Sequence, residues 1–434
     1  MHRRLFLGLA AALASVGPAL AETAAAPGGP TPSDLLGAQG DPAFLAWLDG
    51  FYARKLADGW STSVLVQTLT GLSPDPRVLA HNAAQPEFAL PIGDYVSRQL
   101  TPAVVAMGRK MRDGVALLPQ IRQTYGVPGD ILVAIWGMES GFGRNQGDMD
   151  VVRSLATLAA EDPRRSAWAE TELDACLRIV STGAASRDRL RGSWAGAMGQ
   201  TQLLPSAFLT TAVSASGNGP PDIWDSSADA LASAANLLAR SGWRRGEGWA
   251  REVILPARFD FGLSEGPKEP PAWWEARGAR RADGAPWSAS DADEAAQLLL
   301  PAGAAGPAFL AFPNHFVIRA YNNSIAYALS VGLLADRIGG APPLATAWPK
   351  EVPLSLEDRM AAQEALTKLG YAPGAPDGLI GLGTRQALRA WQKDRGLPAD
   401  GYLTPSLVAL LRQAAAGAAP AIAQRARPAA LTGD

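Results

Sequence analysis

Cysteine and histidine are scarce in this chain, and their scarcity limits the chemistry that it can perform. The 434 residues hold one cysteine, Cys176, and three histidines, of which His2 lies in an N-terminal leader, leaving His81 and His315. A lone cysteine has no partner for an internal disulfide, and the helical spacing around Cys176 indicates a small buried residue. This set cannot build the usual Cys/His zinc site, and it gives a histidine-based nucleophilic triad little to draw on. Acid–base chemistry must therefore come from carboxylates.

Basic runs and long apolar segments are also missing. The formal net charge is −2 without a concentrated Lys/Arg face, so we expect no nucleic-acid partner. The apolar stretch from Leu5 to about Val16 is shorter than the ~20 residues that span a bilayer. Two arginines precede it and Ala-Leu-Ala follows at 19–21, which predicts a cleavable signal peptide over 1–21. No cysteine lies near that site, so we expect a periplasmic protein without a lipid anchor or stable membrane insertion.

Helical periodicity dominates what remains. Apolar residues recur at spacings of three and four through most of 33–340, and several of these runs open with Asp, Ser or Thr as N-caps. Residues 241–263 and 298–324 break the pattern with short β-branched or apolar runs and turn residues, which predicts strands and loops there. The fold class expected is mainly α, with a small β element inside an α-rich domain.

The C-terminal part has its own organisation. Residues 341–352 are Pro-rich and aperiodic, as expected of a linker between separately folding units. Beyond it, 353–412 contains an internal echo in which Asp377–Gly378 and Asp400–Gly401 each precede apolar residues, a Thr cap and a helix. We expect a small three-helix domain there and a disordered Ala/Pro-rich tail over 413–434.

The stretch LVAIWGMESGFGRNQGD, residues 132–148, carries one carboxylate on the apolar side of a helical run. On a helical wheel Leu132, Ile135 and Glu139 fall within roughly 60° of one another. Glu139 could lie at the helix end and point to water. It could equally be a buried acid with a raised pKa, able to give up a proton near neutral pH. Position alone leaves both interpretations open.

Four ordered motifs carry a resemblance to a known family. They are YGVPGDILVAIWGMESGFG at 125–143, LATLAAEDPRR at 155–165, GSWAGAMGQTQLLPS at 192–206 and AYNNSIAYA at 320–328. With these motifs the chain resembles, over about 34–338, the lytic murein transglycosylases of the membrane-bound lytic transglycosylase B type, which have a lysozyme-like core. The catalytic domain is therefore assigned to 33–340.

The resemblance implies a reaction that one acid can perform. Such enzymes cleave the β-1,4 bond between N-acetylmuramic acid and N-acetylglucosamine and close the muramic acid 6-hydroxyl onto C1, giving a 1,6-anhydro end. One carboxyl can protonate the leaving oxygen and then deprotonate the 6-hydroxyl. A retaining hydrolase would need a second carboxylate about 5 Å away. Glu139 matches the catalytic acid of the family, and the two later motifs hold no second carboxylate. A dry setting on the apolar face would keep it protonated.

The resemblance also implies substrate-binding residues. Ser193 would orient the muramic acid N-acetyl group, and the arginine pair would meet a peptide or lactyl carboxylate. Tyr95 matches a tyrosine of the cleft wall. The residues carried over for binding are Tyr95, Arg164, Arg165, Ser193, Gln202, Tyr321, Asn322 and Tyr327. Structural alternatives stay open: a solvated helix start for the arginines, core aromatics for Tyr321 and Tyr327, and an N-cap for Ser193.

One family feature is degraded in this chain. Some members carry a calcium loop resembling an EF-hand, and the corresponding stretch is VSASGNGPPDIWD. The first, third and fifth ligand positions of such a loop would be Ser214, Ser216 and Asn218, so that only Asp222 and Asp225 supply carboxylates. Calcium sites draw their affinity from carboxylates. We therefore expect no metal and no cofactor.

The segment 353–412, with Trp391 and its two Asp-Gly turns, resembles a peptidoglycan-binding domain, a type that also serves as a spacer. Three functions stay open. The first is a peptidoglycan lytic transglycosylase acting through Glu139 on glycan strands, alone or beside other cell-wall enzymes. The second is a non-catalytic wall-binding scaffold, and the third is a muramidase that hydrolyses the same bond.

Overall fold

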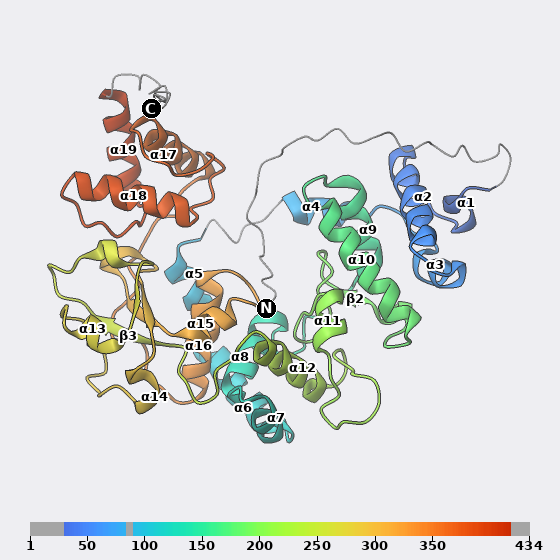
Figure 1. The fold of residues 1–434 in the computed structure, drawn as a ribbon, viewed down its shortest axis with the longest axis horizontal. Coiled ribbons are helices and arrows are strands. Elements are labelled where there is room, and N and C mark those ends of the chain that lie inside the picture. Colours follow the sequence, from blue (N-terminus) through green and yellow to red (C-terminus); the bar gives the residue numbers. More distant parts are fainter. Residues whose placement is uncertain (1–29, 84–89, 418–434) are drawn as a thin grey trace, which may run out of the picture. The chain divides into compact units, whose positions relative to one another are not determined.

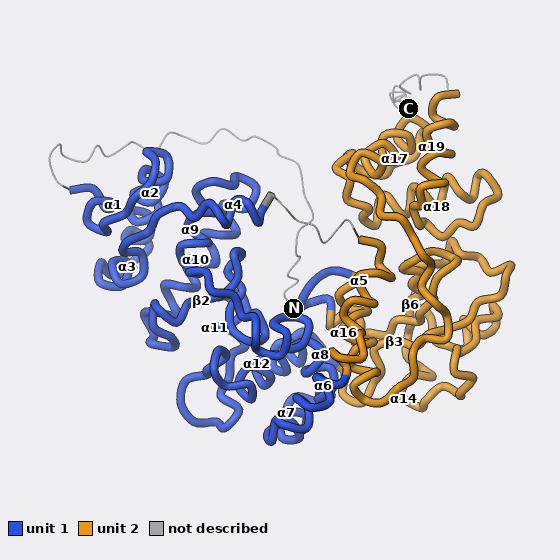
Figure 2. Tube along the Cα trace, turned by 180° about the vertical axis from the view of Figure 1, so that it is seen from behind, with its two compact units in different colours: residues 1–84, 106–243, 319–324 blue, residues 85–105, 244–318, 325–434 orange. Residues whose placement is uncertain are grey.

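The computed structural model describes residues 30–83 and 90–417. The predicted signal peptide lies outside these residues, and so does most of the predicted tail. The chain forms two compact units (Figure 2): unit 1 comprises Met1–Ala84, Ala106–Trp243 and Arg319–Ser324, and unit 2 comprises Gln85–Val105, Arg244–Ile318 and Ile325–Asp434. Within the described ranges, no helix is long and apolar enough to cross a membrane.

Unit 1 is helical, as the periodicity predicts (Figure 1). Asp41, Ser61, Asp150 and Ser226 each cap a helix by accepting a backbone N–H from the first turn. A two-stranded ribbon of β1 and β2 interrupts the helices. The elements of unit 1 are α1 (Pro32–Leu35), α2 (Pro42–Ala57), α3 (Thr62–Leu69), α4 (Pro76–Ala83), the larger part of α6 (Pro102–Gly114), α7 (Leu118–Tyr125), α8 (Gly129–Ser140), β1 (Met149–Asp150), α9 (Val151–Glu161), α10 (Ser166–Ser181), β2 (Arg191–Gly192), α11 (Pro205–Thr211) and α12 (Ser227–Arg240).

The core of unit 1 centres on α9, which is buried along most of its length and packs against α10. Leu155 and Leu158 of α9 and Leu173 and Leu177 of α10 are fully buried in this cluster. Cys176 is also fully buried there, and burial raises the pKa of its thiol. The small buried residue expected from the spacing is confirmed.

Unit 2 contains a five-stranded antiparallel sheet in the order β4-β6-β7-β3-β5. Strand β3 lies in the predicted stretch 241–263 and β7 in 298–324, while β6 overlaps the start of the second stretch. Residues 313–318, expected as strand or loop, instead form a helix, because Pro313 suits a first helical turn and the Asn314 side chain bonds the Arg244 backbone. The strands are β3 (Ala250–Ile254), β4 (Lys268–Glu269), β5 (Arg280–Arg281), β6 (Ala296–Leu299) and β7 (Ala308–Ala311).

The helices of unit 2 fall into two groups. The first accompanies the sheet: α5 (Ile92–Gln99), α13 (Pro271–Glu275), α14 (Ala289–Ala292), α15 (Pro313–Ile318) and α16 (Ile325–Ile338). The second forms the small C-terminal domain, coloured orange to red in Figure 1: α17 (Leu356–Lys368), α18 (Leu382–Asp394) and α19 (Pro405–Gly417). Leu366, Leu388, Trp391 and Leu411 form its core. Because α19 continues to Gly417, residues 413–417 are helical rather than part of a tail.

The internal echo has a structural cause. Gln363 Oε1 accepts the N–H of Gly378 at 2.7 Å while its Nε2 donates to Asp377. Gln392 makes the same pair of bonds to Gly401, at 2.8 Å, and to Asp400. Each Asp-Gly turn is thus held by a buried glutamine from the preceding helix, and both glycines have positive φ.

The Pro-rich segment lies against the sheet. The backbone N–H groups of Ala345 and Thr346 donate to the Glu252 carboxylate of β3 at 2.8 Å each. Trp348 packs over Gly93 of α5, where a Cβ would approach its side chain to 2.7 Å. Segment 341–352 therefore has fixed partners within unit 2 and is not a free spacer.

Candidate active site

Glu139 lies in the last turn of α8, a helix that ends where Gly141 takes a left-handed conformation. Residues 131–136 of this helix are buried, and Leu132 and Ile135 are fully so. Glu139 itself is half-buried. The acid is thus at the helix end and half-buried, so a raised pKa for Glu139 stays a prediction.

The turn after Glu139 is strained and tightly held. Phe142 has a φ of 63°, a region that non-glycine residues rarely adopt, and its ring packs edge-on against Trp136. Ser140 Oγ accepts the N–H of Gly143 at 2.8 Å and donates to the carbonyl of Gln200 at 2.5 Å. Such strain costs about 1–3 kcal/mol and persists where the surroundings enforce it, often at functional sites.

Ser193 follows the short β1–β2 ribbon in a tight turn. Its Oγ accepts the N–H of Ala197 at 3.1 Å, and its own N–H donates to the Ala197 carbonyl. Gly192 is required beside it, because a Cβ there would lie 2.0 Å from that carbonyl oxygen. In the described ranges the hydroxyl hydrogen of Ser193 has no acceptor, so it can donate to a ligand.

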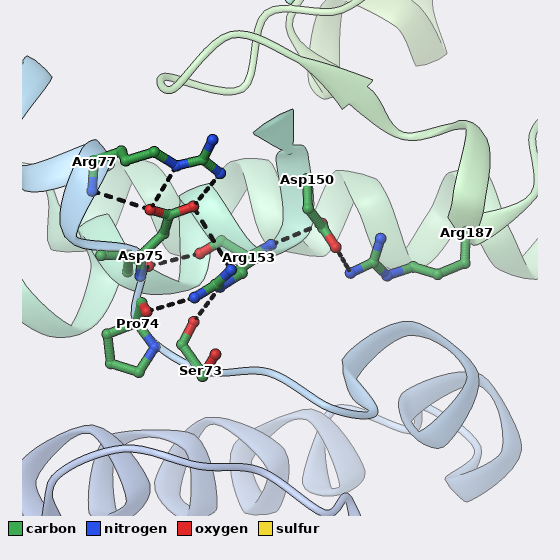
Figure 3. Close-up of polar contacts among 8 residues, drawn as sticks. Ser73, Pro74, Asp75, Arg77, Asp150, Arg153 and Arg187 are labelled. Atoms are coloured by element: carbon green, nitrogen blue, oxygen red, sulfur yellow. Dashed lines mark hydrogen bonds and ion pairs between the residues drawn. The ribbon is translucent and has the colours of Figure 1, made fainter. Parts of the chain in front are cut away.

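A polar network behind the ribbon fixes its position (Figure 3). Asp150 caps α9 through the N–H of Arg153 at 3.0 Å and accepts from the Arg187 guanidinium at 2.7 Å. Arg153 donates to the carbonyls of Ser73 and Pro74. These bonds connect the loop before α4 to the start of α9. Because Asp150 pairs with Arg191 in the ribbon, these bonds position the strand that leads to Ser193.

Tyr321 interacts electrostatically with Glu139. Burial raises the pKa of the Tyr321 phenol well above its ordinary value, and the Glu139 carboxylate raises it further. Its Oη donates to the Thr201 carbonyl at 3.3 Å. A phenol with such a pKa stays neutral and serves as a hydrogen-bond donor. Asn322, the next residue, is exposed.

Gln202 combines strain with a fixed orientation. Its φ is 52°, and its Nε2 donates to the carbonyls of Gln146 and Gly199 at 2.9 and 2.8 Å. The amide oxygen has no donor among the residues described, so it can accept a hydrogen bond from a ligand. Gln146 also bonds the Trp224 carbonyl. This supporting role was not apparent in the sequence, where Gln146 is one polar residue of a loop.

The basic pair is split. Arg164 is 83% exposed in its side chain and pairs with Asp162. Arg165 is half-buried and its guanidinium carbon lies 5.3 Å from the centre of the Trp194 ring, which also stacks with His81. A role for Trp194 was not predicted from the sequence, although its position directly after Ser193 was a signal.

The two remaining tyrosines belong to unit 2. Tyr95 is half-buried on α5, and Tyr327 is 4% exposed on α16. Their role in a cleft beside Glu139 stays a prediction. Unit 1 holds the other seven candidate residues.

Searched over the described parts of the chain, the side chains of His, Cys, Asp and Glu form no group of three or more that could hold a metal ion.

Comparison with known proteins gives two family matches. The model described as Transglycosylase SLT domain matches residues 43–336, and that described as Putative peptidoglycan binding domain matches 355–411. A curated relative, membrane-bound lytic murein transglycosylase B of Escherichia coli (strain K12), is 33% identical over 217 residues. The match covers 50% of this chain and spans 58% of the length of that relative.

Solved structures agree with these matches. SltB3 from Pseudomonas aeruginosa in complex with NAG-anhNAM-pentapeptide is 44% identical with a TM-score of 0.81, covering 86% of this chain and 100% of that chain. The Escherichia coli lytic transglycosylase SLT35 in complex with calcium is 28% identical with a TM-score of 0.57, and the match covers 69% of this chain and 93% of that chain. The mainly α, lysozyme-like fold class is thereby confirmed. Because the Transglycosylase SLT domain model matches well over half of this chain, the chain belongs to the transglycosylase SLT domain family.

Proposed function

We propose that this protein is a lytic murein transglycosylase that cleaves the bond between N-acetylmuramic acid and N-acetylglucosamine and leaves a 1,6-anhydro end. The observation that carries the proposal is the setting of Glu139, a half-buried acid at the end of α8 beside the neutral phenol of Tyr321. Among the residues carried over from the resemblance it is the one carboxylate. The SltB3 relative was solved with an anhydro-muramic ligand, which supports an anhydro product here.

The chemistry needs one proton to move twice. Protonated Glu139 donates to the glycosidic oxygen as its bond to C1 breaks, and the N-acetyl carbonyl assists at C1. The Ser193 hydroxyl, whose hydrogen has no acceptor among the described residues, would hold that N-acetyl group. The Glu139 carboxylate then takes the proton of the muramic acid 6-hydroxyl as its oxygen bonds to C1. The acid is regenerated and no water is consumed.

Other residues would bind the strand. Gln202 offers an amide oxygen, Tyr321 and Asn322 lie next to each other in the chain, and Arg164 and Arg165 supply positive charge for a peptide or lactyl carboxylate. Tyr95 and Tyr327 complete the set as cleft residues.

The wider context belongs to the same proposal. Residues 355–411 match a putative peptidoglycan-binding domain, so we assign them to retention on the cell wall. Export to the periplasm through the predicted signal peptide of residues 1–21 follows from a peptidoglycan substrate. Glycan strands are the partner proposed, and an association with other cell-wall enzymes stays a prediction.

The test compares wild type with Glu139→Gln on purified sacculi, with soluble products identified by mass spectrometry. The amide is isosteric but cannot donate the proton, so turnover should fall at least about a hundred-fold while the melting temperature and sacculus binding stay unchanged. Glu364→Gln, at an exposed position of α17, is the matched control. Reducing ends from wild type would identify a muramidase, and an absence of cleavage would identify a binding scaffold.

A further inference from the structure

The loop between α11 and α12 departs from a calcium site in its side chains. The relative SLT35 was solved in complex with calcium. The loop that resembles a calcium loop in this chain holds Ser214, Ser216 and Asn218 at its first, third and fifth ligand positions. Ser214 Oγ lies 3.1 Å from Ser216 Oγ and donates to the Asn218 carbonyl at 2.9 Å. These hydroxyls bond to one another within the loop, and neutral oxygens are weak calcium ligands without carboxylates.

The two remaining carboxylates of the loop bind an arginine. Arg189 donates from one terminal nitrogen to Asp222 at 2.6 Å and from the other to Asp225 at 2.6 Å. Its guanidinium carbon also lies 5.2 Å from the centre of the Trp224 ring. The carboxylates that a calcium ion would need are thus bridged by a guanidinium of the protein, and the residues do not fit the metal.

The arginine holds a turn with a fixed backbone. Asp222 Oδ1 accepts the N–H groups of Trp224 and Asp225 at 3.0 Å each. Asp229, from the first turn of α12, accepts the N–H groups of Asp222 and Ala215 at 2.9 Å. The turn is therefore anchored to α12 on one side and to Arg189 on the other.

That turn supports the loops of the candidate active site. The Trp224 carbonyl accepts hydrogen bonds from the side chains of Gln146 and Gln200 at 3.0 Å each. The Gln146 carbonyl in turn accepts from Gln202, and the Gln200 carbonyl accepts from Ser140, the neighbour of Glu139. Hydrogen bonds thus connect the turn with Ser140, the residue after Glu139, and with Gln202.

We propose that Arg189 is a positioning residue that takes the place of a bound cation: it bridges Asp222 and Asp225 and so holds the Trp224 carbonyl in contact with the loops of Glu139 and Gln202. This inference rests on the proposed function. Isolated surface ion pairs contribute about 0–1 kcal/mol, but a guanidinium that bridges two carboxylates over an aromatic ring fixes geometry as well as charge. Its effect belongs to catalysis more than to global stability.

The matched control is Arg178. It also pairs with an aspartate, Asp174 at 3.0 Å, and its guanidinium carbon lies 5.3 Å from the centre of the Trp60 ring. Among the described residues, the Arg178 side chain bonds Asp174 and contacts Trp60 but makes no bond to the turn or to the loops around Glu139. Replacement of Arg178 by glutamine therefore removes a similar set of contacts without removing the proposed function of Arg189.

The experiment measures anhydro-product formation and melting temperature for five proteins: wild type, Glu139→Gln, Arg189→Gln, Arg178→Gln and the triple variant Arg189→Gln/Asp222→Asn/Asp225→Asn. For Arg189→Gln we expect kcat to fall about ten-fold with KM within about two-fold, since small misplacements of catalytic groups carry large rate costs. Arg178→Gln should match wild type. The triple variant, which removes the unpaired negative charge but keeps acceptor oxygens, should recover most of kcat.

Three results on the variants would overturn the proposal, and so would one result on the wild type with calcium. The first three are an unchanged kcat in Arg189→Gln with only a lower melting temperature, an equal loss in Arg178→Gln, and a triple variant no faster than Arg189→Gln. A clear rise in wild-type melting temperature with calcium at ~1 mM would also refute it, because a ligand that binds the native state must stabilise it. Failure of the proposed function is recognised separately, as wild type that forms no anhydro product.

Discussion

Single backbone conformations decide how closely the segments around Glu139 approach one another. Gly147 has a φ of 83°, and a Cβ there would lie 2.2 Å from the carbonyl oxygen of Gly192. Gly192 in turn precedes Ser193 in the β1–β2 ribbon. Contact with backbone atoms cannot be relieved by a rotamer change. Position 147 therefore requires glycine both for its left-handed φ and for the close approach to Gly192.

We predict that Gly147→Ala displaces the Ser193 turn. This variant should lose about 2 kcal/mol or more of unfolding free energy compared with an alanine substitution at another glycine of similar φ. The reason is that overpacking adds to the cost of the left-handed conformation. Gly217→Ala is the control, with a φ of 74° and nothing within 4 Å of the added Cβ. Chemical denaturation of both variants measures the difference. Equal losses would mean that the ribbon moves freely.

Individual residues also mark the limit of what the sequence could reveal. Glu139 and Ser193 were identifiable because each lies inside a local motif. Arg189 was not, because its partners Asp222 and Asp225 are remote in sequence and an arginine in a polar loop is usually solvated. Trp194 acquires its neighbours Arg165 and His81 in the same way, from three separate segments.

Among the elements, the three C-terminal helices depend on two equivalent side-chain clamps. Gln363 and Gln392 are 1% and 2% exposed, and each satisfies a glycine N–H and an aspartate of its turn. Loss of one clamp leaves a buried donor without a partner, which costs about 1–3 kcal/mol.

We therefore predict that Gln363→Ala and Gln392→Ala each lower the melting temperature of the full chain and reduce its retention on sacculi. Gln413→Ala, at an exposed position of α19, is the control and should leave both unchanged. Thermal unfolding and a sacculus pull-down measure the two effects. If both clamp variants behave like the control, the repeated turns do not depend on glutamine.

Elements with strong local signals were predictable from sequence, and short ones were not. The helices of unit 1 combine caps with long periodic runs. By contrast β4 and β5 are two residues each, too short for a periodic pattern, and they exist because β6 and β3 provide partners. The helix α15 was missed because its apolar run is short and flanked by turn residues.

At the scale of the whole molecule, the C-terminal domain is fixed to the sheet of unit 2 by a buried ion cluster. Glu265 accepts from Arg385 at 2.7 Å and from Arg389 at 2.6 Å, and its side chain is 11% exposed. Desolvation alone would raise the Glu265 pKa, but the bonds and charges of the two arginines outweigh it and lower the pKa. The sequence suggested a free linker because Pro-rich composition does not reveal which side chains a segment contacts.

The sign of the pH effect follows from that lowered pKa. The Glu265 cluster contributes its full stability above the carboxyl's unfolded pKa of about 4.3, and the contribution is lost as pH falls through the lower folded pKa. Breaking a buried pair by removing one partner costs about 3–5 kcal/mol. The arginines lie beyond residue 351, so truncation at that point removes them while the sheet and Glu265 remain.

We predict that Glu265→Gln destabilises the full chain and has almost no effect on a truncated chain. In the full chain it should lower the unfolding free energy by about 3 kcal/mol at pH 7, because Arg385 and Arg389 lose their counter-charge. In a chain truncated before Glu351 it should change stability by less than about 0.5 kcal/mol, since the carboxylate then faces water. Denaturation at pH 7 and pH 3 measures both, and the full-chain difference should shrink at the lower pH as Glu265 is protonated. Equal effects in the two backgrounds would show that the domain is tethered rather than docked, and the truncated chain would then match the full chain in stability.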